Sequence, residues 1–166
     1  MAVLIAGVGY QNMRDQSVGP DVMPALSQLD WPAETEILHL HFGPIHVVQW
    51  LEERPGHFDR MVFVAAVARR RKPGGVYCYR WEGFLPPAEE IQQRIGEAVM
   101  GVIDLDNLLI VAQHFRVLPA DVIVVEVEPE DTGWGVGFTP RVEAALPTVI
   151  ETVRRVATEG YYEQPA

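Results

Sequence analysis

Continuous apolar segments are the feature of this 166-residue chain that most restricts its fold. Residues 1–6 (Met-Ala-Val-Leu-Ile-Ala) and residues 61–66 (Met-Val-Phe-Val-Ala-Ala) contain no polar side chain. A strand that is apolar on both faces needs cover on both faces, as in the parallel sheets of α/β proteins. The two segments therefore predict buried strands in a sheet that lies between two layers of helices.

The rest of the chain alternates strand and helix patterns, which indicates a mostly parallel sheet. The sequence predicts strands at residues 2–7, 35–41, 60–66, 75–81 and 121–127. It predicts helices at about 20–29, 44–53, 87–116 and 140–158, with a break in the third near Gly96 or Gly101. We expect an α/β three-layer sandwich with a twisted, mostly parallel five-stranded sheet. A single domain should cover residues 1–158, and residues 159–166 should form a flexible tail.

Composition and charge exclude several classes of function. The net charge of −10 argues against a nucleic-acid partner, because such a partner requires a broad basic face. The single cysteine, Cys78, excludes an internal disulfide and a multi-thiolate metal site. No apolar run approaches the roughly 20 residues of a membrane span, and no basic segment precedes the first apolar run as in a signal peptide. We therefore expect a cytoplasmic protein without a membrane span.

A glycine-hinged loop follows the first predicted strand and contains Gly7, Gly9, Asp15 and Gln16. Loops at the carboxyl ends of central strands hold the sites of open α/β sheets. This loop has one carboxylate, Asp15, where a metal or acid–base site usually has more. The dinucleotide fingerprint is also incomplete, because Asn12 stands where a third glycine is needed. The position indicates a functional site, whereas its side chains lack the usual chemistry.

Histidines and carboxylates elsewhere in the chain allow two interpretations each. His39 and His41 project from the same face of a strand and could bind a divalent ion together with a carboxylate. Alternatively, they are polar residues of an edge strand that hydrogen-bond to water or a neighbour. Asp104 and Asp106 fall within the long helical region, where carboxylates commonly cap a second helical segment.

One cluster of cations stands out in this acidic chain, namely Arg69, Arg70, Arg71 and Lys72. A charged run between strands is commonly a solvated loop. The alternative is a site for carboxylates, because the guanidinium group binds them through two parallel hydrogen bonds. We expect these four side chains to contact a partner protein.

The order of the motifs resembles that of the hydrogenase maturation proteases. These small α/β endopeptidases trim the carboxyl-terminal tail of the large subunit of a nickel–iron hydrogenase. Their opening motif, Gly-x-Gly-Asn followed by Asp-Asp/Glu and glycine, matches Gly7-Val-Gly9-Tyr10, Asp15-Gln16 and Gly19. Their later motifs match Glu128-Pro129, Gly137-Phe-Thr-Pro140-Arg-Val142 and Ala145-Leu-Pro147. The resemblance covers about residues 2–155 and implies the α/β sandwich described above.

The resemblance also implies that this chain has lost the metal ligands of the family. Family members use the carboxylate after the loop aspartate, an aspartate that ends the third strand, and a histidine of the long helix. The matching positions here are Gln16, Ala65 and about Gly101, and Asp104 replaces the histidine only if the register shifts by three residues. An amide is a weak ligand, and alanine and glycine side chains are not ligands for nickel or zinc. We therefore expect no metal site and no confident catalytic residue.

By this resemblance, the chain is expected to be a degenerate pseudo-protease. It would bind a nickel–iron hydrogenase protein, such as the large subunit, as an assembly factor or retained subunit without cleaving it. The candidate site loop comprises Asp15, Gln16, His41 and Asp104. The alternative is an active, metal-dependent maturation endopeptidase in which Asp15, His41 and Asp104 hold nickel or zinc as substitute ligands. A third possibility is a small-ligand binder that uses the basic loop.

Overall fold

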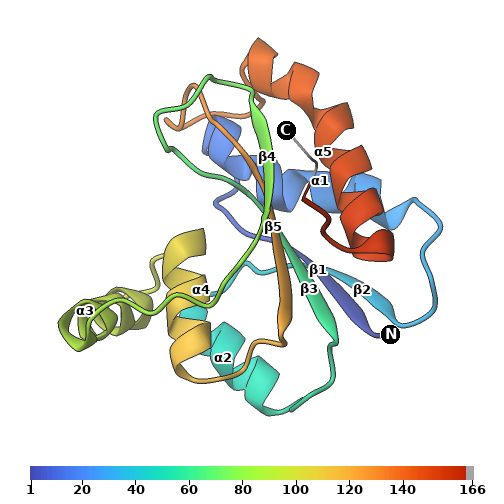
Figure 1. Ribbon diagram of the computed structural model, residues 1–166. Coiled ribbons are helices and arrows are strands. Elements are labelled where there is room, and N and C mark those ends of the chain that lie inside the picture. Colours follow the sequence, from blue (N-terminus) through green and yellow to red (C-terminus); the bar gives the residue numbers. More distant parts are fainter. Residues whose placement is uncertain (164–166) are drawn as a thin grey trace.

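The computed structural model describes residues 1–163, which form an α/β sandwich of three layers (Figure 1). The strands are β1 (Val3–Gly7), β2 (Thr35–His39), β3 (Arg60–Ala66), β4 (Val76–Arg80) and β5 (Asp121–Val127). The helices are the short 3₁₀ helix η1 (Arg14–Ser17), α1 (Val18–Ser27), α2 (Pro44–Glu52), α3 (Ala88–Val99), α4 (Leu105–His114) and α5 (Pro140–Glu159). The expected fold class is confirmed.

The five strands form one sheet in the order β2-β1-β3-β5-β4. All neighbouring strands are parallel except the edge strand β4, which runs antiparallel to β5. The chain leaves β1 toward β2 on one side and then crosses to β3 on the other side. The carboxyl ends of β1 and β3 therefore flank the point where the order of the strands reverses, which is where open α/β sheets place their ligands.

Two apolar clusters cover the two faces of the sheet, as the uninterrupted apolar runs require. Ile5 and Val62 point into the cluster under α1 and α5, whereas Leu4 and Phe63 point into the cluster under α2 and α4. Neighbouring residues face opposite sides because side chains alternate along a strand. All four side chains are at most 1% exposed, and each contributes roughly 1.5–3 kcal/mol of burial free energy.

The predicted long helix is divided into α3 and α4, with the break at the second of the two expected glycines. Gly101 has a φ of +81°, which disfavours residues with a side chain and ends the α-helical path. Asp104 begins α4 by accepting a hydrogen bond from the backbone N–H of Asn107 (2.8 Å), so the predicted cap is confirmed for this residue. Helix α3 packs on α4 and α2 and projects from the body of the molecule (Figure 1).

The first residues of the predicted tail make ordered contacts. Gly160 is buried, and Tyr161 packs against the cluster under α5. Tyr162 is 67% exposed, and residues 164–166 of the predicted tail lie outside the described residues. Across residues 1–163, the helices are too short or too polar to cross a membrane.

Candidate functional site

A cavity of about 210 Å³ lies outside the carboxyl ends of β1 and β3. Its walls are Val8, Gly9, Gln16, Ala65, Ala66, Val67, Ala68, Ile103, Asp104, Leu105 and Asp106. These residues come from the loop after β1, the end of β3 and the start of α4. We call this cavity the edge pocket. Larger pockets exist elsewhere, but this one occupies the position that the topology of the sheet favours for a ligand.

Tyr10 and Gly19 bring the walls of the edge pocket together. The hydroxyl group of Tyr10 accepts a hydrogen bond from the backbone N–H of Ile103 (2.8 Å), so the loop after β1 is linked to the segment before α4. A Cβ atom on Gly19 would collide with the backbone of Val8, so only glycine allows α1 to begin this close to β1. In the sequence, Tyr10 stands out only as part of a motif, and nothing near it indicates this contact 93 residues away.

Asp15 is fully buried and belongs to the framework of the site. Its Oδ2 atom accepts hydrogen bonds from the backbone N–H groups of Glu130 (2.8 Å) and Asp131 (3.0 Å). Thr139 donates its backbone N–H to Oδ1 (2.8 Å) and its hydroxyl group to Oδ2 (2.8 Å). Burial alone would raise the pKa of Asp15, but these hydrogen bonds outweigh it and hold the pKa below its ordinary value. The carboxylate therefore ties the loop after β1 to the loop after β5 and does not line the pocket.

The remaining wall residues offer few ligands. Gln16 contributes a neutral amide, and Ala65 is only 2% exposed and has no donor atom. Gly101, the third matching position, is exposed in the turn between α3 and α4 and does not line the pocket. Asp104, three residues after Gly101, does line the pocket. The structure thus brings Gln16 and Asp104 into one pocket and leaves Asp15 and His41 outside its lining.

His41 is exposed on the surface beyond the end of β2, and it is not among the residues that line the edge pocket. Its ring lies near that of His39, tilted by 55°, with 5.5 Å between the ring centroids. Burial lowers the pKa of His39, so this imidazole is mostly neutral near pH 7. The strand predicted to carry both histidines ends at His39, so His41 lies beyond it and the two do not share a strand face as predicted. Their rings are still neighbours, but no carboxylate completes a metal site with them within the described residues.

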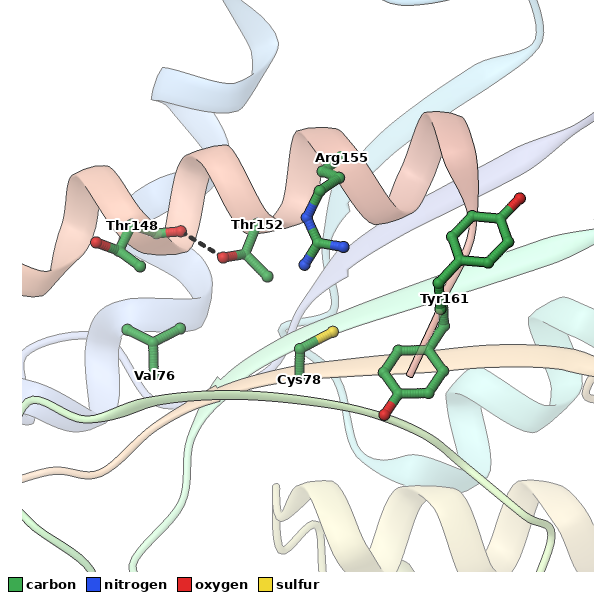
Figure 2. Close-up of a pocket in the computed structure, with 7 residues that line it drawn as sticks. Val76, Cys78, Thr148, Thr152, Arg155 and Tyr161 are labelled. Atoms are coloured by element: carbon green, nitrogen blue, oxygen red, sulfur yellow. Dashed lines mark hydrogen bonds between the residues drawn. The ribbon is translucent and has the colours of Figure 1, made fainter. Parts of the chain in front are cut away.

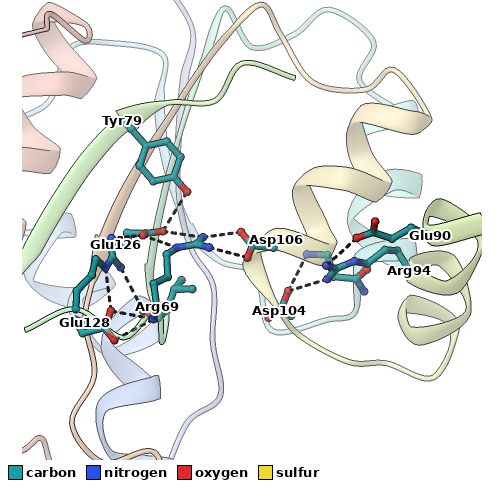
Figure 3. Close-up of polar contacts among 11 residues, drawn as sticks. Arg69, Tyr79, Glu90, Arg94, Asp104, Asp106, Glu126 and Glu128 are labelled. Carbon is teal, nitrogen blue, oxygen red and sulfur yellow. Dashed lines mark hydrogen bonds and ion pairs between the residues drawn. The ribbon is translucent and has the colours of Figure 1, made fainter. Parts of the chain in front are cut away.

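The carboxylate of Asp106 is paired with Arg69, which also binds a buried glutamate (Figure 3). Arg69 donates from Nη2 to Asp106 Oδ1 (2.7 Å) and from Nε to Glu126 Oε1 (2.8 Å). Tyr79 donates its hydroxyl group to Glu126 Oε2 (3.1 Å). Burial and the nearby charge of Glu126 raise the pKa of Tyr79, so this hydroxyl group keeps its proton.

Arg71 also binds Glu126 and pairs in addition with a second buried glutamate, Glu128. Its Nη1 lies 2.7 Å from Glu126 Oε1, and its Nε lies 3.0 Å from Glu128 Oε2. Its guanidinium group also stacks on the ring of Tyr77, 3.9 Å from the centroid. Burial would raise the pKa of Glu128, but hydrogen bonds from Arg71 and from the backbone of Arg69 outweigh it and lower that pKa. We call Arg69, Arg71, Asp106, Glu126 and Glu128 the arginine–carboxylate cluster.

The cluster changes the role of the predicted partner-binding run. Arg69 and Arg71 use their guanidinium groups within their own chain, because two buried glutamates of β5 and its continuation require counter-charges. Arg70 and Lys72 are exposed and form no ion pair with any residue from 1 to 163. Among the described residues, Arg70 and Lys72 are therefore the two members of the run whose charges are not used within the fold, although Arg69 is also partly accessible to solvent. Glu126, an isolated charge among valines, was the sequence signal for a buried ion pair.

The edge pocket does not fit the nickel or zinc that the resembled family implies. Asp104 already accepts the hydrogen bond that caps α4, and its Oδ1 lies 3.9 Å from Nη1 of Arg94 (Figure 3). Asp106 is neutralised by Arg69. Among residues 1–163, no three histidine, cysteine, aspartate or glutamate side chains converge as a metal site requires. The two carboxylates of the wall are therefore engaged within the fold, and the wall offers no imidazole beside them to hold these ions.

A second cavity, of about 360 Å³, lies between β4 and α5 and contains Cys78 and Arg155 (Figure 2). Burial raises the pKa of the Cys78 thiol, and the charge of Arg155 offsets this only in part. The thiol is therefore protonated near pH 7, which makes it a poor nucleophile. This cavity does not provide the hydrolytic group that the edge pocket lacks.

No family model matches this chain, and no curated protein sequence matches it. Solved structures do match. The hydrogenase 2 maturation peptidase from Thaumarchaeota archaeon SCGC_AB-539-E09 is 23% identical, with a TM-score of 0.66 over 97% of this chain and 100% of that chain. The hydrogenase maturating endopeptidase HybD from E. coli is 24% identical, with a TM-score of 0.67 over 92% of this chain and 90% of that chain.

A third match is the [NiFe] hydrogenase maturation protease HycI from Thermococcus kodakarensis KOD1. It is 19% identical, with a TM-score of 0.68 over 95% of this chain and 93% of that chain. The three alignments cover nearly the whole of each chain, so the similarity extends to the complete sandwich. The chain therefore has the fold of the hydrogenase maturation proteases.

Proposed function

We propose that this protein binds a nickel–iron hydrogenase protein, such as the large subunit, as an assembly factor or retained subunit and does not cleave it. The observation that carries this proposal is the composition of the edge pocket. Gln16 and Ala65 stand where the resembled family has two carboxylates, and Asp104 is engaged in capping α4. Metal-assisted hydrolysis needs a bound ion that polarises the carbonyl group or generates hydroxide.

The framework around the pocket supports a binding role. Asp15 ties the two loops together through four hydrogen bonds, and Tyr10 joins the loop after β1 to the segment before α4. These contacts keep the shape of the carboxyl edge although the metal ligands are absent. A protein surface of fixed shape can bind a partner without any catalytic group.

The alternative is an active endopeptidase with substitute ligands. Asp15, His41 and Asp104 are the residues that this alternative requires, but Asp15 is buried with both oxygens occupied and His41 does not line the edge pocket. Bringing the three side chains to one ion would require the loop after β1 to lose the hydrogen bonds of Asp15. The geometry therefore favours binding without cleavage.

The test mixes the full chain with a nickel-loaded precursor of the hydrogenase large subunit. We expect size-exclusion chromatography to give a complex and intact-mass spectrometry to find the precursor at full length. An active maturation endopeptidase with its own precursor is the positive control. Removal of the tail by this chain, abolished in His41→Ala or Asp104→Asn, would establish the alternative. Failure to form any complex would contradict both functions.

A further inference from the structure

The cavity between β4 and α5 lies at the edge of the sheet, and we call it the β4–α5 cavity. It measures about 360 Å³ and shares no wall residue with the edge pocket. Strand β4 ends the sheet on this side, so no further strand among residues 1–163 covers it. Pockets for small molecules commonly enclose about 300–1,000 Å³. The size of the β4–α5 cavity therefore suits a small molecule.

Two rows of side chains form facing walls of this cavity. Val76 and Cys78 are two residues apart, so both point from β4 to the face that α5 covers. Thr148, Thr152 and Arg155 follow at the i, i+4 and i+7 positions of α5 and share one face of this helix. The strand thus supplies a thiol and an apolar side chain, and the helix supplies hydroxyl groups and a cation.

Arg155 is the one charged residue among those that line the β4–α5 cavity. Figure 2 shows its guanidinium group and the thiol of Cys78 directed toward each other from α5 and β4. Among residues 1–163, no carboxylate oxygen lies within 4.0 Å of its nitrogen atoms, those of Glu151 and Glu159 one turn away on α5 included. In contrast to Arg69 and Arg71, this half-buried arginine keeps its N–H donors for a group outside the fold.

Hydroxyl groups add further donors around the guanidinium group. Thr152 donates its hydroxyl group to the backbone carbonyl of Thr148 (2.7 Å), so that donor is used within α5. The hydroxyl groups of Thr148, Tyr161 and Tyr162 also line the cavity and form no hydrogen bond within the described part of the chain. The wall contains no carboxylate that would repel an anion. Its chemistry therefore favours a negatively charged group with several acceptor oxygens.

We propose that the β4–α5 cavity binds a small molecule that carries a carboxylate or phosphate group. The guanidinium group of Arg155 binds such a group through two parallel hydrogen bonds. The free hydroxyl groups donate to its remaining oxygens, and Val76 and Cys78 contact the rest of the molecule. This site goes beyond the proposed function, and neither depends on the other.

Alkylation of Cys78 tests the proposal, because this only cysteine of the chain lies in the cavity wall. Iodoacetate carries a carboxylate, whereas iodoacetamide is its neutral amide of nearly the same size. In both reactions the thiolate displaces iodide, so the ratio of the two rates is independent of how far the thiol is ionised. We expect this ratio to exceed that of free cysteine. The rate with iodoacetate should also saturate as its concentration rises, whereas the rate with iodoacetamide should stay linear.

Arg155→Gln should lower the ratio about tenfold or more, the loss expected for a hydrogen bond to a charged group. Arg154→Gln is the matched control, because it removes the same charge from the neighbouring, exposed position of α5 that does not line the cavity. Its ratio should change by no more than about twofold, since solvent and salt screen an exposed charge. Both variants should melt within a few degrees of wild type, because neither side chain is fully buried.

Competition identifies the group that the site prefers. Inorganic phosphate and acetate should each slow the reaction of wild type with iodoacetate more than sodium chloride of the same ionic strength does, and the stronger competitor names the preferred group. Equal slowing by sodium chloride would show that the charge of Arg155 attracts the reagent without a binding site, and would overturn the proposal. A ratio equal to that of free cysteine, or an equal loss in Arg154→Gln and Arg155→Gln, would overturn it as well.

Discussion

Asp15 and Glu126 are both fully buried carboxylates, but their charges are stabilised in different ways. Asp15 has three backbone N–H groups and one hydroxyl group around it and no cation. Glu126 is bound by the guanidinium groups of Arg69 and Arg71. The first arrangement fixes the path of two loops, and the second joins β5 to the segment before β4. In both cases the carboxylate oxygens are occupied by the fold.

Because their oxygens are occupied, neither carboxylate is available as a catalytic group, but the two differ in what holds their charge. A carboxylate surrounded by N–H donors is kept ionised by their hydrogen bonds, so its stability depends on presenting two acceptor oxygens to them. A carboxylate paired with arginines keeps its charge through neighbouring cations, so it is sensitive to their removal. The two sites should therefore respond differently to mutation and to acid.

The largest effect is expected when the cations of Glu126 are removed. Arg69→Ala/Arg71→Ala leaves the side chains of Glu126 (1% exposed) and Glu128 (4% exposed) without their guanidinium partners. We expect the free energy of unfolding to fall by about 3–5 kcal/mol, the usual cost of breaking a buried ion pair. Urea denaturation measures this change.

Arg70→Ala/Lys72→Ala is the matched control, because it removes two cations from the same run without breaking an ion pair. It should change the free energy of unfolding by about 0.5 kcal/mol or less. Equal effects of the two double variants would show that the arginine–carboxylate cluster does not stabilise the fold.

A smaller effect with a distinct pH dependence is expected at Asp15. Asp15→Asn replaces one acceptor oxygen by an N–H₂ group that faces hydrogen-bond donors, and should cost about 2–3 kcal/mol at pH 7. The folded pKa of Asp15 lies below its ordinary value, so the unfolded state binds the proton more tightly. The contribution of Asp15 is therefore complete above the ordinary value of 3.8 and is lost as the pH falls through the lower, folded pKa.

Denaturation of wild type and Asp15→Asn at a series of pH values separates the contribution of the Asp15 carboxylate from the pH dependence of the rest of the protein. The difference in the free energy of unfolding between wild type and variant should be constant at neutral pH. It should shrink as the pH falls below the pKa of the carboxyl group in the unfolded state. A difference that grows under acid would contradict the assigned hydrogen bonds.

The smallest effect is expected at Asp104, where a cap and a metal ligand give different results. Asp104→Ala removes the acceptor for the N–H of Asn107 and should lower the free energy of unfolding by about 1 kcal/mol. Asp104→Asn retains an acceptor and should be nearly neutral, because asparagine is an equally good cap. Stabilisation of wild type by added nickel or zinc, absent in Asp104→Asn, would assign a ligand role instead.

The fold could be predicted because its information is local. The strands β3 and β5 begin and end where the apolar runs predicted, and Gly101 divided the helical region. The glycine loop after the first strand lies at the reversal of the strand order, which is the place that the sequence proposed for a site. These features depend on residues that are close together in the sequence.

The groups that bind the buried carboxylates could not be predicted, because they are distant from them in the sequence. Asp15 binds N–H groups more than 110 residues later, and Arg69 binds a glutamate 57 residues later. In the sequence alone, the arginines are a charged run between two strands and Asp15 is a lone carboxylate. The partners of these side chains depend on how the loops at the carboxyl edge of the sheet pack together in the folded protein.

We expect the edge pocket to hold no metal centre, and calorimetric titration with nickel and zinc measures this. Gln16 and Ala65 line the pocket where carboxylates would be required, and Asp106 is paired with Arg69. Neither ion should form a one-to-one complex tighter than about 1 µM, which corresponds to about 8 kcal/mol of binding free energy. A one-to-one complex tighter than that limit, weakened by Asp104→Asn, would show that the pocket holds a metal ion.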